Sequence, residues 1–319
     1  MNSLDIVILD QKTLGDDIRL DPIAELGSLR VYPGTSREEV VDHIGNASIV
    51  LINKVRLDRE VLSRCPGVRL IGTFATGYDA VDIGYCREKG ITVCNVVGYS
   101  TESVVNVTVG MALNLSCRLG EYREHVVSGL YTKEGCANYL KPVFHDLEGK
   151  VWGVCGYGHI GKRVAEVARA LGCRVLYTKE HPDLLDPDCV SLDELCRNAD
   201  ILSLHMPLTD KTRKLFDASR ISGLKAGAIF INVGRGGLCD EAALADAVEQ
   251  GRLGGLGVDV YTSEPFPESH PFYRIRNCPN VLLTPHMAWA SVEARDRCIR
   301  EVAENIKAFQ NGTPRNVVS

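Results

Sequence analysis

The chain has 319 residues, which is more than one ordinary core holds and predicts two domains. Its composition, 45 % apolar and 24 % charged, is that of a soluble globular chain and excludes a disordered or low-complexity protein. The formal net charge is −5, and the absence of a basic run argues against a nucleic-acid partner.

Short β-branched runs alternate with helical patterns through the first third of the chain. The candidate strands are residues 6–10, 29–32, 49–53, 70–74 and 91–95. Candidate helices between them include 59–64 and 37–44, the second preceded by Ser36 and Glu39 at the spacing of a capping box. Such alternation predicts a mostly parallel sheet covered on both faces.

A long helix with few charges is predicted for residues 102–119. Its apolar side chains fall on more than one face, so it must be buried on several sides. The rest of its own chain or a second copy could cover it, and we expect a homodimer formed through this region.

A second alternating series of strands and helices fills the rest of the chain. Its candidate strands are residues 151–156, 174–177, 201–205, 228–233, 257–260 and 281–284, and a helix over 291–310 follows. The fold class is therefore predicted as α/β, with two doubly wound parallel-sheet domains.

The segment from Gly156 to Gly161 has the pattern G-x-G-x-x-G. Alone the pattern is weak, but here it follows an apolar strand and opens a helix predicted for 162–171. Gly156 permits the tight turn, Gly158 lets the backbone approach a pyrophosphate, and Gly161 lets the helix pack on the strand. The free amides at the helix start favour phosphate. The sequence therefore predicts a dinucleotide site.

The choice of dinucleotide is left open by the end of the following strand. An acid that binds the ribose hydroxyls of NAD normally stands there, but this chain has Thr178 and Lys179, followed by Glu180. Lys179 could attract a 2′-phosphate, whereas Glu180 could serve NAD. Because there is no arginine pair, we expect NAD(H), with NADP(H) not excluded.

Three polar side chains follow successive strands of the second series: Arg235, Glu264 and His286. Singly, each is compatible with a turn cation, a solvated acid or a packed imidazole. Together they suit reduction of a 2-keto acid. Arg235 offers a fork-shaped cation for a carboxylate and a keto oxygen, His286 an acid for that oxygen, and Glu264 an anion that favours imidazolium and orients the ring.

The whole chain resembles the D-isomer-specific 2-hydroxyacid dehydrogenase family. The matching pieces are the glycine loop, residues 203–209 (SLHMPLT), 232–236 (NVGRG), 257–265 (GVDVYTSEP) and 284–289 (TPHMAW). Residues 74–79 (FATGYD) and 285–290 (PHMAWA) are most similar to the glycerate dehydrogenase, or hydroxypyruvate reductase, branch.

The resemblance implies a Rossmann nucleotide domain, residues 100–287, inserted into a flavodoxin-like substrate domain, residues 1–99 and 288–319, with an active-site cleft between them. It gives the same catalytic roles to Arg235, Glu264 and His286, and it places substrate against residues 75–78, with no metal. The residues expected to bind substrate are Ala75, Thr76, Gly77, Tyr78, Arg235 and His286. The residues expected to bind cofactor are Gly156, Tyr157, Gly158, His159, Ile160, Gly161, Thr178, Lys179, His205, Pro207, Val233 and Asp259, the last through the nicotinamide carboxamide.

The activity implied is reversible reduction of hydroxypyruvate to D-glycerate, or of glyoxylate to glycolate. Two alternatives stay open: a preference for another 2-keto acid, and a non-catalytic dinucleotide-sensing scaffold. No apolar stretch reaches the roughly 18 to 20 residues of a membrane span, and the twelve cysteines form no CxxC pair. We therefore expect a cytoplasmic protein with reduced cysteines and no membrane partner.

Overall fold

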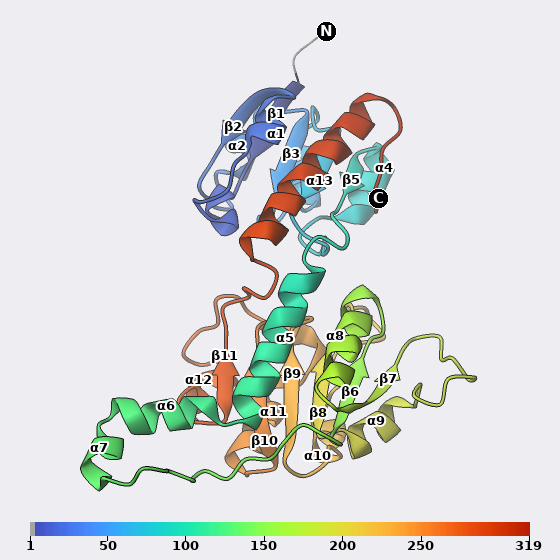
Figure 1. The fold of residues 1–319 in the computed structure, drawn as a ribbon. Coiled ribbons are helices and arrows are strands. Elements are labelled where there is room, and N and C mark those ends of the chain that lie inside the picture. The colour runs from blue at the N-terminus through green and yellow to red at the C-terminus, as the bar shows by residue number, and fades with distance from the viewer. Residues whose placement is uncertain (1–3) are drawn as a thin grey trace. The chain divides into compact units, whose positions relative to one another are not determined.

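The computed structural model describes residues 4–319, and the chain divides into two compact units (Figure 1). The first lies within residues 1–100 and 289–319, and the second spans residues 101–288. Each division falls one residue later than the domain boundaries expected from the sequence.

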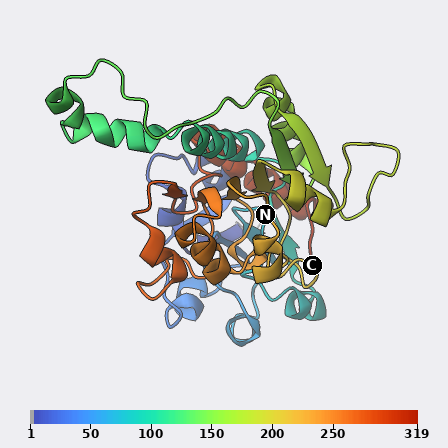
Figure 2. The ribbon, with the colours of Figure 1, turned by 90° about the horizontal axis from the view of Figure 1, so that it is seen from below.

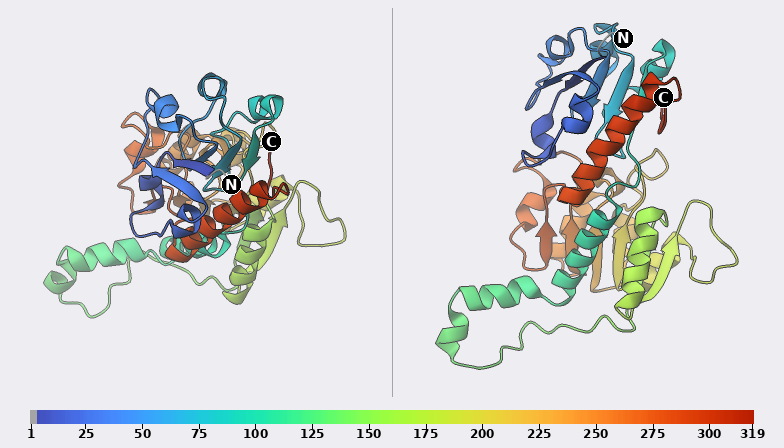
Figure 3. Two further views of the ribbon diagram at one scale, coloured as in Figure 1. Left: turned by 90° about the horizontal axis from the view of Figure 1, so that it is seen from above. Right: turned by 45° about the horizontal axis from the view of Figure 1, so that its top comes forward.

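The first unit contains one parallel five-stranded sheet in the order β2-β1-β3-β4-β5. Its strands are β1 Leu4–Ile8, β2 Gly27–Val31, β3 Ile49–Ile52, β4 Leu70–Thr73 and β5 Thr92–Cys94. Its helices are α1 Asp21–Ala24, α2 Val40–Ile44, α3 Arg59–Ser63, α4 Ile83–Lys89 and α13 Val292–Gln310, with a short 3-10 helix at Gln11–Leu14. β3 is buried along its whole length because helices cover both faces of the sheet, with α13 along one of them (Figure 3).

The second unit contains one parallel six-stranded sheet in the order β11-β10-β9-β8-β6-β7. Its strands are β6 Val151–Cys155, β7 Arg174–Thr178, β8 Ile201–Leu204, β9 Ala228–Asn232, β10 Leu253–Val258 and β11 Val281–Leu283. The chain passes from β6 outward to β7 and then back across to β8, so the direction of winding reverses between β6 and β8. In open α/β sheets this reversal point is where ligands bind. The predicted α/β class with parallel sheets is confirmed.

Helices pack on both faces of the second sheet. The helices of this unit are α5 Thr101–Ser116, α6 Leu119–Val127, α7 Leu130–Glu134, α8 His159–Ala170, α9 Leu192–Asn198, α10 Ala218–Ser222, α11 Glu241–Glu249 and α12 Pro271–Ile275, with a 3-10 turn at Gly236–Leu238. Figure 2 shows α5 and α8 on one face and α9 to α12 on the other.

The helix predicted for 102–119 is two helices. α5 ends at Ser116, because Arg118 adopts a left-handed φ of 56° and α6 begins at Leu119. α5 packs against α8, β9 and β10, so its own unit buries most of its apolar side chains. α6, α7 and the segment that follows extend away from the sheet of this unit (Figures 1 and 2).

Other element ends also differ from the predictions. The helix expected from residue 37 begins at Val40: Ser36 donates its amide to the Glu39 carboxylate, but residues 37–39 form a turn. β10 begins at Leu253, four residues early, because Gly254 allows a close approach that a side chain would block; a Cβ there would lie 2.3 Å from the Gly227 carbonyl oxygen.

Among residues 4–319, no helix is long and apolar enough to cross a bilayer.

Candidate active site

Arg235 stands on a turn directly after β9. Asn232, the last residue of β9, shapes this turn with its side chain. Its amide group donates to the Arg235 carbonyl at 2.9 Å, and its oxygen accepts from the Gly234 amide at 3.0 Å. Asn232 is 2 % exposed, so the turn rests on a buried polar anchor. The Arg235 side chain is half-buried, and its guanidinium donates to the Gly234 carbonyl at 2.8 Å.

Glu264 lies on the loop that follows β10. Its Oε1 accepts from the Tyr261 amide at 3.1 Å and closes residues 261–264 into a turn. The Arg235 turn touches this loop through Gly236, where a Cβ would lie 2.1 Å from the Tyr261 carbonyl carbon. Only glycine permits that approach, so the backbone beside Arg235 and the loop of Glu264 are held in direct contact.

His286 follows β11 and has a left-handed φ of 53°. Few residues other than glycine adopt this conformation, and such strained positions persist where the surroundings hold them. Here the holding group is Asp259, whose carboxylate accepts from the Thr284 hydroxyl at 2.6 Å and from the amides of Met287 and Ala288, each at 2.9 Å. Asp259 is 1 % exposed, and burial raises the pKa of its carboxyl although these donors act against the rise.

The side chains of Glu264 and His286 meet directly. Glu264 Oε2 lies 2.7 Å from His286 Nδ1, within hydrogen-bond distance. Because Nδ1 faces a carboxylate, it carries a proton, and Nε2 is the nitrogen left to exchange one. The His286 side chain is 23 % exposed and the Glu264 side chain is 29 % exposed, which leaves the imidazole accessible to a small molecule. β9, β10 and β11 are adjacent parallel strands, so the structure brings Arg235, Glu264 and His286 to one edge of one sheet.

The glycine loop lies at the reversal point of the second sheet, at the end of β6. Gly156 has a φ of 96°, and a Cβ there would lie 2.8 Å from the His205 carbonyl carbon. A Cβ on Gly161 would lie 2.0 Å from the Gly156 carbonyl oxygen, whereas one on Gly158 would meet nothing within 4 Å. The loop is thus tightly packed at Gly156 and Gly161 and open at Gly158. This fits a diphosphate that approaches the start of α8.

Other expected cofactor residues surround this loop. Tyr157 stacks on Tyr177 with ring centroids 3.6 Å apart, and β7 ends at Thr178, whose carbonyl accepts the Gly156 amide at 3.0 Å. His159 and Ile160 form the first turn of α8, so that helix starts three residues before its predicted beginning.

The charges after β7 pair with neighbours. Lys179 Nζ lies 3.9 Å from an oxygen of Asp183, and Glu180 accepts from Lys211 at 3.2 Å. The acid nearest the strand end is therefore already tied to a lysine.

The carboxyl ends of β8 and β9 supply the remaining expected cofactor contacts. His205 follows β8, Pro207 is exposed two residues later, and Val233 follows β9 at 9 % exposure. His205 is the unusual member, because its Nδ1 is buried and finds no hydrogen-bond partner among residues 4–319. Burial lowers the pKa of His205 to about 3.

Residues 75–78, the expected substrate loop, follow β4 in the first unit. The carbonyl of Ala75 accepts from Val96 and Thr73, and that of Thr76 accepts from Asn95 at 2.8 Å. These bonds turn the carbonyls inward, and within residues 4–319 the structure gives no hydrogen bond to the amides of 75–78. The loop therefore offers donors to an anion.

Sequence reasoning assigned no role to two residues that hold this site together. Asn232 shapes the Arg235 turn, and the Tyr261 hydroxyl donates to the Thr284 carbonyl at 2.8 Å, which links the loop of Glu264 to the segment before His286. Burial raises the pKa of the Tyr261 hydroxyl. A polar residue that ends a buried strand was a usable signal for Asn232; nothing in the local sequence singled out Tyr261.

Comparison with known proteins agrees with this geometry. The family model for the NAD binding domain of D-isomer specific 2-hydroxyacid dehydrogenases matches residues 109–288, which include the glycine loop and the three polar residues. A hydroxypyruvate reductase of Blautia hydrogenotrophica is 35 % identical over 98 % of this chain and 99 % of its own length. A glycerate dehydrogenase of Methylorubrum extorquens is 35 % identical over 98 % of each chain. The crystal structure of a D-lactate dehydrogenase of Aquifex aeolicus, complexed with NAD and lactic acid, matches with a TM-score of 0.86 at 29 % identity, over 97 % of this chain and 96 % of that one.

Proposed function

The chain belongs to the D-isomer specific 2-hydroxyacid dehydrogenase family, as its sequence predicted, and on that premise we propose that it reduces hydroxypyruvate to D-glycerate reversibly with NADH. Glyoxylate is the second substrate proposed. The observation that carries the proposal is the 2.7 Å contact between Glu264 and His286 beside the Arg235 turn, on a sheet that also bears a dinucleotide loop.

His286, oriented by Glu264, supplies the proton for the reaction. Reduction of a keto group needs a proton on the oxygen, and His286 Nε2 is the donor, since its Nδ1 is bonded to Glu264. The carboxylate also fixes which way the ring faces. In the reverse direction the same nitrogen accepts the proton from the hydroxyl group.

Arg235 holds the substrate. Its guanidinium presents parallel N–H donors that match a carboxylate and the neighbouring keto oxygen, a geometry that lysine lacks. The carbonyls of Ala75 and Thr76 accept hydrogen bonds from within their own unit, and a contact of residues 75–78 with substrate stays a prediction.

The glycine loop and the start of α8 bind the diphosphate of the cofactor, which when bound supplies the hydride. We propose a preference for NADH, because no arginine stands between Thr178 and Asp183 to bind a 2′-phosphate, and Lys179 lies 3.9 Å from the Asp183 carboxylate. The nicotinamide contact of Asp259 stays a prediction. Both of its oxygens already accept bonds from residues 284–288.

We also propose a homodimer, with the contact moved past α5. A group of exposed apolar side chains lies on α6, α7 and the segment after them, and not on α5: Leu119, Val126, Val127, Leu130, Tyr131, Leu140, Val143 and Phe144. Neighbouring exposed apolar side chains of this kind are typical of a protein contact. A reducing compartment such as the cytoplasm is proposed from the twelve cysteines, all of which are free thiols.

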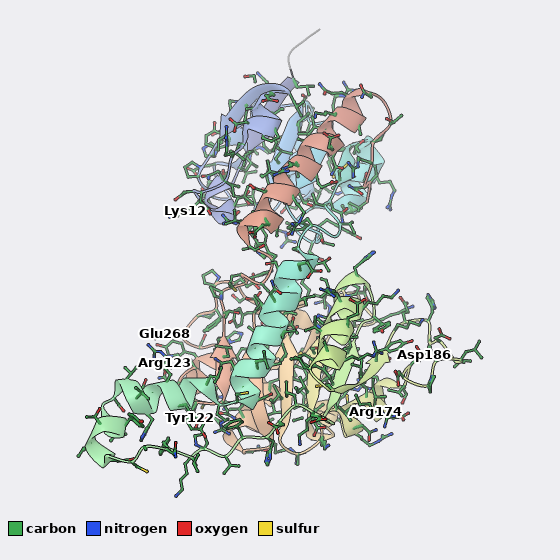
Figure 4. All side chains as sticks on the ribbon, viewed as in Figure 1. Lys12, Tyr122, Arg123, Arg174, Asp186 and Glu268 are labelled. Carbon is green, nitrogen blue, oxygen red and sulfur yellow. The ribbon has the colours of Figure 1, made fainter. Side chains whose placement is uncertain are left out.

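Steady-state kinetics test the activity. We expect turnover of hydroxypyruvate with NADH, and a lower kcat/KM with NADPH and with larger 2-keto acids. His286→Ala and Glu264→Gln should lower kcat by about 100-fold or more, the usual contribution of a positioned acid. Glu268→Gln is the matched control for Glu264→Gln: it removes an exposed glutamate four residues away and should leave kcat unchanged (Figure 4).

Two outcomes would contradict the proposal. If folded His286→Ala retained the parent kcat, the role of the imidazole would be wrong. If the protein bound NADH but oxidised none with any 2-keto acid, a dinucleotide-sensing scaffold would be the better account.

A further inference from the structure

Beneath the loop that carries Glu264 lies a buried hydrogen-bond network that the proposed chemistry does not use. Glu241, the first residue of α11, is 8 % exposed, and His270, which precedes α12, is 8 % exposed. His270 Nε2 lies 3.0 Å from Glu241 Oε2. A carboxylate and an imidazole are costly to desolvate, so the burial of these two side chains needs an explanation.

The hydrogen bonds of His270 fix which nitrogen faces Glu241. Its Nδ1 accepts from the Phe272 amide at 3.2 Å, as an N-cap does. The ring proton is therefore on Nε2 and is donated to Glu241. Phe266 and Phe272 pack against the ring, with centroids 4.9 and 5.2 Å away, which excludes water from this bond.

The remaining bonds of Glu241 point at the loop after β10. Its Oε1 accepts from the Thr262 amide at 2.9 Å, and its Oε2 also accepts from the Thr262 hydroxyl. Residues 261–264 form no helix or strand, so these bonds supply an anchor that regular structure does not. The start of a helix is also a favourable place for a carboxylate.

Thr262 adjoins the residue that orients Glu264. The Tyr261 amide donates to Glu264 Oε1, and Glu264 Oε2 contacts His286 Nδ1. Two carboxylates thus accept from consecutive amides of one loop. Glu264, within the loop, binds the Tyr261 amide, and Glu241, on α11, binds the Thr262 amide. Displacement of Thr262 would move the Tyr261 amide and, with it, the carboxylate that holds His286.

We propose that Glu241, Thr262 and His270 are positioning residues for the proposed dehydrogenase: they fix the loop of Glu264 so that its carboxylate meets His286 in the orientation that proton transfer needs. This inference rests on the proposed function. None of the three touches the reacting atoms; they act through Glu264. Small displacements of a catalytic group lower turnover strongly, whereas substrate and cofactor contacts elsewhere are unaffected.

Thr262→Val and Thr262→Ser separate this role from mere stability. Valine keeps the branched side chain but removes the hydroxyl, and serine keeps the hydroxyl. We expect Thr262→Val to lower kcat with hydroxypyruvate and NADH about 10-fold, with KM for both within twofold, and Thr262→Ser to restore the parent kcat. Glu241→Gln should lower kcat further, about 100-fold, because its amide group would face the donors of Thr262 and His270.

A second measurement reads the Glu264–His286 contact without turnover. In protein labelled with ¹⁵N-histidine, the His286 Nδ1 proton, assigned by its loss in His286→Ala, should move upfield in Thr262→Val and Glu241→Gln as its hydrogen bond weakens. The matched control is Asp200→Asn, which removes a carboxylate that accepts from the Val151 amide at 2.9 Å. Val151 begins β6, which lies three strands away from β10 in the same sheet. It should change neither kcat nor the His286 signal.

The results discriminate between the two proposals. A parent protein that reduces no 2-keto acid refutes the proposed function, while the ring-proton signal still tests positioning. Unchanged kcat and an unmoved His286 signal in folded Thr262→Val overturn the positioning role, as does a fall in kcat with that signal unmoved. If Glu241→Gln does not fold, Thr262→Val decides alone.

Discussion

The buried His205 is expected to make the stability of this protein depend on pH. Trp152 Nε1 donates to the Ser203 hydroxyl at 2.9 Å, and that hydroxyl lies 2.9 Å from His205 Nε2. His205 Nδ1 is buried without a partner within residues 4–319. An imidazolium would place a second N–H donor and a charge in this spot, so burial lowers the pKa of His205 to about 3.

The sign and size follow from linkage. In the unfolded chain His205 titrates near its ordinary pKa of about 6.5, so as the pH falls below that value the unfolded state gains a proton that the folded state refuses. Stability from this group is complete above pH 6.5 and is lost progressively as the pH falls toward 3. Between pH 7 and pH 5 the loss is about 2 kcal/mol, since each pH step below 6.5 costs about 1.4 kcal/mol.

Urea unfolding of the parent and of His205→Gln, followed by circular dichroism at both pH values, measures this loss. The glutamine does not titrate, so the variant should lose about 2 kcal/mol less than the parent between pH 7 and pH 5. His145→Gln, which removes an exposed histidine from the same unit, controls for the loss of an imidazole and should keep the parent's dependence. Equal losses in the parent and in His205→Gln would refute the reasoning.

Three further predictions concern the cofactor and the dimer. Gly161→Ala would put a Cβ 2.0 Å from the Gly156 carbonyl oxygen and should weaken NADH binding at least 10-fold in a fluorescence titration, whereas Gly223→Ala, with its nearest atom at 3.5 Å, should not. Glu180→Arg replaces a carboxylate that is paired with Lys211 by a guanidinium that can bind a 2′-phosphate, and it should raise kcat/KM with NADPH about 10-fold; no such gain would mean that another residue sets the preference. Val127→Asp puts a charge on a side chain that is 62 % exposed and should shift sedimentation from dimer to monomer; an unchanged dimer would place the contact elsewhere.

The sequence predicted the architecture because its signals are local. Alternating apolar strands and helices are visible residue by residue, and the glycine loop has its meaning from the strand before it and the helix after it. Element ends were less well predicted. β10 starts at Leu253 because Gly254 packs on Gly227, a long-range contact that makes glycine favourable in a strand where it is ordinarily a breaker.

The extension formed by α6 and α7 was not predicted at all. The periodic pattern of the preceding helix continues through residue 119, and only the left-handed φ of Arg118 ends it. Arginine gives no sign of such a conformation in the sequence, since glycine and asparagine are the residues that usually mark it. The apolar side chains beyond this break are exposed within their own unit, so the period of a single helix could not place them.

The three polar residues could be singled out, but the groups that hold them could not. Glu264 and His286 each follow a strand, and a position at the carboxyl end of a parallel strand is visible in the sequence. Glu241 instead begins a helix, where acids are common and usually solvated. It is buried only because the chain returns twenty-one residues later with Thr262 and again with His270 to cover it.

The same reasoning explains how irregular loops can carry precise chemistry. Residues 261–264 and 284–288 have no ladder of backbone bonds to define them, yet each is held by one buried carboxylate, Glu241 for the first and Asp259 for the second. A carboxylate can accept several amides at once, so one side chain fixes a whole turn. The Glu264–His286 contact joins the two turns, and its 2.7 Å length therefore depends on two side chains that touch neither partner. Burial, which makes such carboxylates costly, also keeps water from competing for their donors, so the cost and the precision have the same physical origin.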